Sequence, residues 1–313
     1  MTPPKKKNIT PSTETKNSDD LVSQIAVTLI PGIGSVSGKK LVAYCGSAQA
    51  IFKESRKALQ QIKGMNASII DAIFSKEIQR ESEAEALYIQ DHGVKPLFFT
   101  DSDYPQRLLQ CDDSPVMLYY KGTADLNASR VVAIVGTRNI TDYGKANCEQ
   151  LVKDLTDDGV LIVSGLAYGV DTLAHSCCVR YDIPTVGVMG SGMNVIYPSE
   201  NKELVEDMLE NGGLLTEFTS DTKPDRENFP RRNRIIAGMA DAVVVIESAM
   251  KGGSLITANI ANSYNRDVFA FPGRVMDIYS QGCNHLIRVN RANMIESVAN
   301  LRYIMRWDSP AKK

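Results

Sequence analysis

The stretch RVVAIVGTRN, residues 130–139, decides the fold. Its apolar run, residues 131–135, ends at Gly136, and a segment with helical spacing follows from about residue 143 to 156. A short, uninterrupted Val/Ile run predicts a strand that is covered on both faces, because helices bury both faces of a parallel sheet. Glycine directly after the strand permits the sharp turn into the helix.

The same strand–helix unit recurs through the C-terminal part of the chain. Further apolar runs lie at 160–163, 185–189, 242–246 and 268–271, and a short strand is expected at 214–217. Helical segments lie at about 170–179, 201–210, 231–239 and 254–264. This alternation predicts an α/β domain with a Rossmann-like, doubly wound and mostly parallel sheet. We expect this domain to span residues 81–306, with short strands near 94–99 and 116–120 at one edge of the sheet.

A second, smaller all-α domain is expected over residues 21–80. Here the string IPGIG, residues 30–34, separates two helices, and the second helix carries Lys39. The arrangement resembles a helix-hairpin-helix motif, in which the amides of a turn at Gly32 and Gly34 hold a DNA phosphate. The alternative, a turn that only packs two helices of a sterile-alpha-motif-like domain, stays open. The polar ends, residues 1–20 and 307–313, are predicted to be tails, the first of them disordered.

Composition and charge limit the class of protein. The chain has 313 residues, of which 43% are hydrophobic and 23% charged, which is typical of a soluble globular protein. No apolar run is long enough to cross a bilayer and no signal peptide is visible, so we expect a cytoplasmic protein without membrane contact. The net charge of −2 gives no general attraction to nucleic acid, so any site for a polyanion must come from local charge and backbone dipoles.

Glycines at the predicted strand ends form a candidate phosphate-binding rim. In an open α/β sheet, ligands bind where the carboxyl ends of the strands meet the N-termini of helices. The candidate residues at these ends are Gly136, Thr137, Arg138, Ser164, Gly165, Gly190 and Gly192. A dinucleotide is disfavoured, because the loop after Gly136 lacks the G-x-G-x-x-G fingerprint and the next strand ends in Ser164-Gly165 instead of a ribose-binding acid. No cofactor is therefore predicted.

A cluster of arginines lies close to the same strand ends. The cluster consists of Arg231, Arg232, Asn233 and Arg234, in the first turn of a predicted helix. Positive charge opposes the helix dipole there, so the cluster favours a bound anion. The alternative is pairing with acidic neighbours, for which the candidates are Asp225, Glu227 and Asp241.

A second cationic site opens another predicted helix. Lys251, Gly253 and Ser254 form it, with the lysine as a point charge and the serine as a candidate N-cap. Aromatic residues that could stack on bases lie on the nearby loops, namely Tyr143, Tyr168, Tyr197 and Phe229. Two cationic sites with aromatic neighbours suit the successive phosphates of single-stranded DNA better than one nucleotide.

Signatures of catalysis and metal binding are scarce. The three histidines are far apart, the six cysteines have no paired metal spacing, and neither a nucleophile elbow nor a Walker lysine follows a predicted strand. His175 follows Asp171 in a helix and is interpreted as a buried structural histidine rather than a base. The sequence therefore predicts a protein that is not an enzyme and binds no metal.

Several ordered motifs resemble those of the DNA-processing protein A family (DprA, also called Smf). The resemblance covers residues 21 to about 296 and is carried by VGTR (135–138), SGLAYGVD (164–171), GSG (190–192), FPRRNRIIAG (229–238), GSLITA (253–258), FPG (271–273) and GCNHLI (282–287). It implies a homodimer that binds and protects incoming single-stranded DNA during natural transformation, in competent cells, and loads the RecA recombinase on it. It also implies that the loop 136–138 and the arginine-rich helix contribute to the DNA groove.

The chain departs from the family pattern at a few positions. Tyr168 and Ser199 stand where relatives often carry lysine, which weakens two phosphate contacts, and Lys202 is the candidate replacement one turn on. Gly252 replaces a serine that is common in the family. The winged-helix domain of many relatives is not expected, because the sequence ends soon after Trp307.

Two other functions fit a fold of this class. Nucleoside-monophosphate phosphoribohydrolases have a related fold with an arginine and a glutamate at the strand ends, and Glu247 is the candidate here for the catalytic glutamate. A nucleotide-sensing regulatory module would bind mononucleotides in preference to oligonucleotides. Analogy of fold alone does not separate these two functions from DNA binding.

Overall fold

A computed structural model describes residues 18–307 of the chain. The chain divides into two compact units: Met1–Tyr104 with Asp112–Tyr119, and Pro105–Cys111 with Tyr120–Lys313. The predicted tails lie outside the described residues, except that residues 18–20 open the first helix and Trp307 follows the last. Between residues 18 and 307, no helix combines the length and the apolar character needed to cross a membrane.

The first unit is built mainly of helices. They are α1 (Ser18–Leu29), α2 (Ser35–Cys45), α3 (Ala48–Lys53), α4 (Arg56–Leu59), α5 (Ala67–Ile73) and α6 (Lys76–Asp91), followed by β1 (Lys95–Phe98). The unit extends beyond residue 80, where the sequence analysis ended it, because the long helix α6 packs along α1. Strand β1 neighbours β2 (Met117–Gly122), whose residues 117–119 belong to the same unit.

The predicted helix-hairpin-helix turn lies between α1 and α2. Gly32 has a φ of +83°, a left-handed conformation that favours glycine, and Gly34 caps α2 in an extended conformation. Lys39 Nζ donates to the Asp112 carbonyl at 2.7 Å and to Ser114 Oγ at 2.8 Å. Lys39 therefore serves packing within the first unit, and DNA contact at Gly32, Gly34 and Lys39 stays a prediction.

The second unit is a Rossmann-like α/β domain, as predicted. Its main strands are β3 (Arg130–Val135), β4 (Val160–Gly165), β5 (Thr185–Val188), β6 (Gly213–Thr216), β7 (Ala242–Val245), β8 (Asp267–Ala270) and β9 (Asn293–Met294). They lie in the order β6-β5-β4-β3-β7-β8-β9, and every neighbouring pair in this order is parallel. The last residues of β2 continue the order next to β6. The order reverses at β3 and β7, which makes the carboxyl ends of these two strands the topological switch point.

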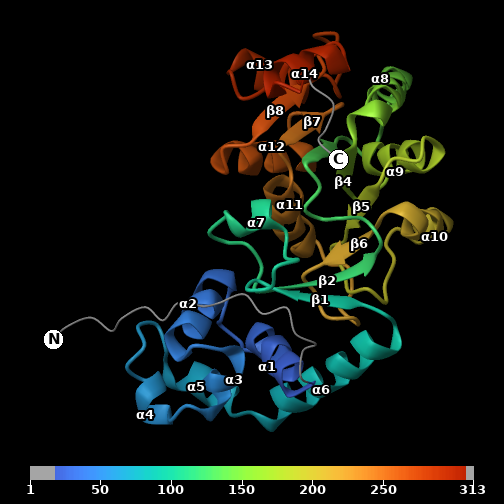
Figure 1. Ribbon diagram of the computed structural model, residues 1–313. Helices are drawn as coiled ribbons and strands as arrows, with labels where there is room; N and C mark the ends of the chain where they lie inside the picture. Colours follow the sequence, from blue (N-terminus) through green and yellow to red (C-terminus); the bar gives the residue numbers. More distant parts are fainter. Residues whose placement is uncertain (1–17, 308–313) are drawn as a thin grey trace. The chain divides into compact units, whose positions relative to one another are not determined.

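Helices cover both faces of this sheet. They are α7 (Gln106–Leu109), α8 (Asp142–Asp154), α9 (Val170–Arg180), α10 (Lys202–Asn211), α11 (Asn228–Met239), α12 (Gly253–Ser263), α13 (Gln281–Arg288) and α14 (Val298–Met305). Figure 1 shows α8, α9 and α10 on one side of the sheet and α11 and α12 on the other. Val132, Ile134 and Ile162 pack into a buried core with residues of α8 and α9. Because both faces are buried, the strands appear in the sequence as continuous apolar runs.

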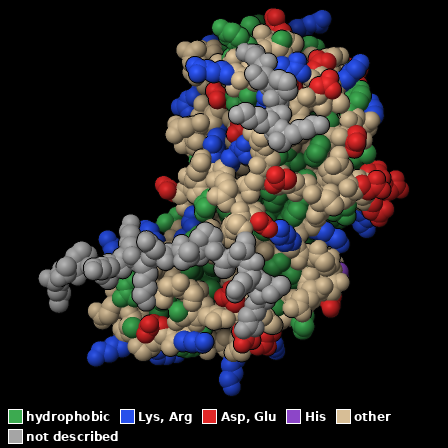
Figure 2. Space-filling model, in the orientation of Figure 1, with side chains coloured by type: hydrophobic (Ala, Val, Ile, Leu, Met, Phe, Trp, Pro, Cys, Tyr) green, Lys and Arg blue, Asp and Glu red, His purple; other side chains and the backbone are tan. Residues whose placement is uncertain are grey.

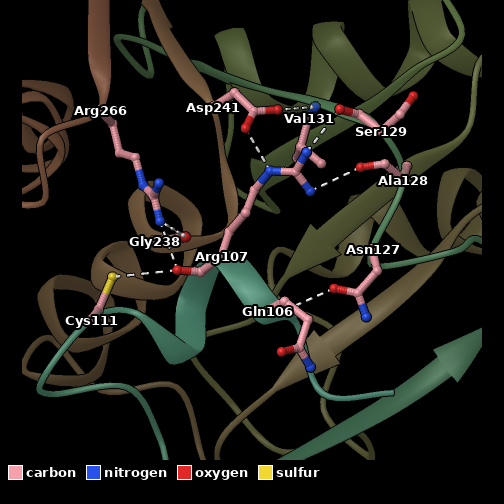
Figure 3. Close-up of polar contacts among 10 residues, drawn as sticks. All are labelled: Gln106, Arg107, Cys111, Asn127, Ala128, Ser129, Val131, Gly238, Asp241 and Arg266. Carbon is pink, nitrogen blue, oxygen red and sulfur yellow. Dashed lines mark hydrogen bonds and ion pairs between the residues drawn. The ribbon is translucent and has the colours of Figure 1, made fainter. Parts of the chain in front are cut away.

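Arg107 ties α7 to the amino ends of the central strands (Figure 3). Its Nε donates to Asp241 Oδ1 at 2.6 Å, and its two Nη atoms donate to the carbonyls of Ala128 and Ser129, each at 2.9 Å. Asp241 also accepts a hydrogen bond from the Val131 amide at 2.9 Å. Both charged side chains are largely buried. Each would therefore be poorly solvated without the other.

Replacing Arg107 with alanine is expected to lower the free energy of unfolding by about 2 kcal/mol, because the change leaves Asp241 without this charged partner and two carbonyls without a donor. Urea denaturation followed by circular dichroism measures the loss. The control is Lys145→Ala, which removes a solvent-exposed pair with Asp142 and should leave the midpoint unchanged. Equal losses in the two variants would contradict a structural role of the Arg107 contacts.

Candidate nucleic-acid interface

A carboxylate of the chain itself fills the switch point of the sheet. Glu247, just after β7, accepts hydrogen bonds from the Thr141 amide at 2.9 Å and from Thr141 Oγ1 at 2.6 Å. Thr141 is the N-cap of α8, and the Glu247 side chain is buried against Gly144 in the first turn of that helix. A nucleotide phosphate would ordinarily bind at such a helix N-terminus. Here the negative charge of Glu247 already occupies the position.

The neighbouring strand ends form a hollow instead. It is lined by residues of the loops after β3, β4 and β5 and of the start of α11, namely Arg138, Leu166, Ala167, Tyr168, Gly190, Tyr197, Phe229 and Arg232. We call it the strand-end hollow. It brings together the arginine after β3 and the arginine-rich helix, as the sequence predicts. Gly190 is part of this lining and packs against Phe229. A side chain at position 190 would collide with the Phe229 ring.

Cationic and aromatic groups meet in the strand-end hollow. The Arg138 guanidinium carbon lies 5.5 Å from the centroid of the Phe229 ring, and the Tyr197 and Phe229 ring centroids are 5.8 Å apart. Tyr168 and Tyr197 are exposed, and Tyr168 Oη donates to Glu200 Oε1 at 2.8 Å. Exposed rings beside a guanidinium offer both a stacking surface for bases and a charge for a phosphate.

The three arginines of α11 occupy different environments. Arg232 is buried and donates to the carbonyl of Val188 at the end of β5. The Arg234 side chain is 12% exposed and donates to Glu217 Oε2 at 2.5 Å. The Arg231 side chain is 60% exposed and lies 3.7 Å from the same Glu217 oxygen. Of the three arginine side chains, that of Arg231 is therefore the most exposed to solvent.

The partner of these arginines differs from the three carboxylates that the sequence suggested. Glu217 follows β6 and lies 17 residues from Arg234 along the chain, whereas Asp241 pairs with Arg107. Asn233 is buried and accepts from Arg232 Nε at 3.2 Å. Direct phosphate contact by residues 231–234 stays a prediction. Arg232 is the least accessible of the three arginines to a phosphate because its side chain is buried.

A second hollow contains Lys251 and Gly253 but not Ser254, and it is lined by Met250, Lys251, Gly252, Gly253, Leu255, Ile256, Asn259, His285, Leu286, Val289 and Arg291. We call it the α12 hollow. It shares no lining residue with the strand-end hollow. Gly252, not Ser254, caps α12, and Ser254 is buried with its Oγ donating to Ser248 Oγ at 2.8 Å. The two cationic sites expected from the sequence thus lie in two separate hollows.

The glycines of the predicted rim let loops pack closely. A side chain at position 136 would collide with Val170, one at 165 with Asp171 and Arg232, and one at 192 with the backbone after β6. Thr137 and Ser164 likewise make internal hydrogen bonds, to Glu247 and Ile134. These glycines position the loops of the strand-end hollow, and phosphate contact by them stays a prediction.

Two ionisable residues of α9 are buried behind the strand-end hollow. Burial raises the pKa of Asp171 to about 6, although the nearby Arg232 opposes this rise. His175 Nε2 donates to the Gly165 carbonyl at 2.7 Å, and in the neutral ring Nδ1 accepts from Thr185 Oγ1 at 2.7 Å. Burial lowers the pKa of His175 to about 4. His175 therefore has the structural role that the sequence analysis assigned to it.

Comparison with known proteins places the chain in a family. It matches the profile of DNA recombination-mediator protein A over residues 95–305. The chain belongs to this family. It is 38% identical over 280 residues to Protein Smf of Synechocystis sp., an alignment that covers 87% of this chain and 69% of that protein. It is 40% identical over 221 residues to DNA processing protein DprA of Streptococcus pneumoniae, covering 70% of this chain and 73% of that protein.

Solved structures of family members have the same fold. The X-ray structure of DprA from Streptococcus pneumoniae superposes with a TM-score of 0.73 at 29% identity, over 93% of this chain and 98% of that chain. DNA processing protein A from Helicobacter pylori, described for its single-stranded DNA binding mode, superposes with a TM-score of 0.62 at 29% identity, over 69% and 96%.

Of the positions expected to depart from the family pattern, Tyr168, Ser199 and Lys202 lie in or near the strand-end hollow, whereas Gly252 lines the α12 hollow. Tyr168 lines the strand-end hollow, and Ser199 and Lys202 lie in the segment after Tyr197 that leads into α10. Lys202 is exposed and is not among the lining residues. The sequence analysis missed Asn201, which is buried and donates to the Leu166 carbonyl at 3.3 Å and to Thr172 Oγ1 at 3.0 Å. Its position at the start of a predicted helix, where asparagine is a common N-cap, was the available signal.

His175→Gln is expected to weaken the acid sensitivity of folding. The ordinary pKa of 6.5 falls to about 4 in the folded state, so only the unfolded chain takes up this proton between those values. Stability from this group is therefore lost as pH falls from about 6.5 to about 4, by roughly 3 kcal/mol in total. Asp171 acts in the opposite direction, since its raised pKa makes the folded state bind a proton first. Thermal midpoints at several pH values measure the slope, and an unchanged slope would contradict the assignment.

Proposed function

We propose that the chain is a non-catalytic single-stranded DNA-binding protein that acts in the cytoplasm during DNA uptake and natural transformation. The observation that carries the proposal is the strand-end hollow, where Arg138 lies over Phe229 beside two exposed tyrosines. The family description as a recombination mediator and the DNA binding described for the Helicobacter pylori relative support it.

Single strands suit this hollow because their bases are open to stacking. Arg138 and the exposed Arg231 would bind phosphates, while Tyr197 and Phe229 would stack against bases. In a duplex the bases are already stacked on each other, so the aromatic contribution would be lost. Figure 2 shows basic side chains interspersed with acidic ones on the face drawn, and the net charge is −2, so binding would depend on such local sites.

The proposed interface extends beyond the lining residues. It comprises the loop residues Gly136, Thr137, Arg138, Ser164, Gly165, Gly190 and Gly192, the arginine cluster 231–234, Lys202, and the α12 hollow with Lys251, Gly253 and Ser254. Because the α12 hollow is separate, a strand that contacts both would pass across the switch point, over the buried Glu247.

The glutamate that would make the site a phosphoribohydrolase is poorly placed for catalysis. Glu247 is buried and both of its carboxylate oxygens accept hydrogen bonds from Thr141. A catalytic carboxylate needs access to the reacting sugar. This geometry supports DNA binding over hydrolysis of nucleoside monophosphates.

Replacing Arg138 and Arg231 together with alanine is expected to weaken binding of a labelled thymidine oligonucleotide about 10- to 100-fold and to reduce the salt dependence by about two phosphate contacts. Arg231 is chosen over Arg234 because Arg234 is held by Glu217. Arg180→Ala is the matched control, since this exposed arginine ends α9 at the amino ends of the strands. Fluorescence anisotropy measures affinity, and full affinity in the double variant would overturn the proposed interface.

We also propose that the protein is a homodimer and that it loads RecA on the bound strand. The resemblance to the family implies both, and exposed apolar side chains around the α12 hollow, Met250, Ile256 and Val289, offer a surface for a second copy. Lys251, which lines the same hollow, would then contact the strand at the edge of the dimer interface. Ile256→Asp is expected to convert the dimer to a monomer by placing a charge in that interface. Light scattering after size exclusion measures the mass, with exposed Val275→Asp as control. A dimer that persists in Ile256→Asp would place the contact elsewhere.

A further inference from the structure

A buried carboxylate and a buried guanidinium converge behind the lining of the strand-end hollow. A Cβ at position 165 would collide with Asp171 Oδ2 and with both Nη atoms of Arg232, so the two side chains flank the Gly165 α-carbon. Arg232 also lines the hollow, whereas Asp171 lies behind it, at the start of α9. The lining therefore carries the positive charge of Arg232. The attraction of this charge for an anion in the hollow depends on whether Asp171 is ionised.

Asp171 is the group of this cluster that changes its charge near pH 6, because its charged neighbours are arginines, which stay protonated. The two cations are Arg232 from α11 and Arg138 from the loop after β3. The amide of Ala167 acts in the same direction as these cations, whereas the hydroxyl proton of Ser164 on β4 is donated to the Ile134 carbonyl at 2.5 Å.

The other ionisable neighbours are neutral in the same range. On α9 itself, His175 is neutral near pH 7 because burial lowers its pKa to about 4. From α8, the thiol of Cys148 stays protonated because burial raises its pKa. Neither group therefore changes charge where Asp171 does.

We propose that binding of an anionic DNA strand at the strand-end hollow is coupled to protonation of Asp171. The inference rests on the proposed function, and it adds a positioning residue whose charge tunes the affinity. A phosphate beside Arg138 and Arg232 offsets the cations that stabilise the carboxylate and adds a negative charge near it. Asp171 then takes up a proton, and the two arginines act on the phosphate without an opposing carboxylate.

The direction of the pH dependence follows from this coupling. In the free protein the pKa of Asp171 is about 6, raised by burial and held down by Arg232 and Arg138. A bound phosphate raises that pKa further, so binding takes up a proton between the free and the bound values. Affinity is therefore highest near pH 6 and below, and falls as pH rises above about 6 until Asp171 is ionised in the complex as well.

The test is fluorescence anisotropy with a labelled thymidine oligonucleotide at fixed ionic strength from about pH 6 to about pH 8. Wild-type protein is expected to bind about fivefold more weakly at the upper end, the change over this range that corresponds to a rise of about one unit in the pKa of Asp171 on binding. Asp171→Asn removes the ionisable group, so its affinity should be nearly independent of pH and, at about pH 8, at least as high as that of wild type.

Two histidine variants and a second measurement complete the design. His92→Gln, in the first unit, should keep the wild-type slope, and His285→Gln tests whether the histidine of the α12 hollow causes it. Calorimetry of wild-type protein in two buffers of different ionisation enthalpy counts protons taken up on binding. Even if Asp171→Asn does not fold, this count can overturn the coupling, because binding without proton uptake contradicts it.

The outcomes are distinct. A slope that persists in Asp171→Asn, a slope that disappears in His285→Gln, or binding without proton uptake by wild type would each overturn the coupling and leave DNA binding intact. Absence of oligonucleotide binding at every pH would instead overturn the proposed function, and the coupling with it. Proton uptake together with a flat profile for Asp171→Asn would support the coupling.

Discussion

The hydrogen bonds between Glu247 and Thr141 determine which part of the strand-end edge can take a ligand. A doubly wound sheet concentrates its helix N-termini at the switch point, and an anion is usually drawn there. In this chain the anion is a side chain, held by the N-cap of α8 at 2.6 and 2.9 Å. The fold therefore keeps the electrostatic stabilisation of a filled site without a bound nucleotide. The hollows of this edge instead lie at the ends of β4 and β5 on one side and at the start of α12 on the other.

Contacts within the chain also distinguish arginines that stabilise the fold from arginines that are free to bind a ligand. Glu217 neutralises much of the charge that Arg234 and Arg231 bring to the first turns of α11, which offsets their unfavourable position against the helix dipole. Arg232 is buried beside the end of β5, where it replaces solvent as the donor to a strand carbonyl. Among residues 18–307, Arg138 has no comparable ion pair or side-chain hydrogen bond and rests on the Phe229 ring. A guanidinium on a ring keeps its hydrogen-bond donors for a phosphate.

Much of this fold is readable from local sequence because parallel strands buried on both faces need continuous apolar runs. The run 131–135 lies within β3 and the run 242–246 contains β7. The first unit was harder to delimit, since the helix after Ser75 looks like a charged connector and only its packing on α1 assigns it to that unit. The hollow could be predicted in outline, because Arg138 and the arginine cluster follow strand ends. The individual roles could not, because they depend on distant pairings: Glu247 lies 106 residues from Thr141, and Arg232 lies 44 residues from Val188.

Buried charge behind the strand-end hollow is unfavourable for folding in itself. Desolvation raises the pKa of Asp171 and lowers that of Arg232, so each group would be easier to accommodate in its neutral form. An apolar pair of similar size would often be at least as stable. Ionisable groups kept under such strain are common at binding sites, where their charge acts on a ligand through low-dielectric surroundings. Gly165 permits the arrangement by leaving room for both side chains at one α-carbon. The proposed effect on an anion at the hollow would account for buried charges that the stability of the sheet does not require.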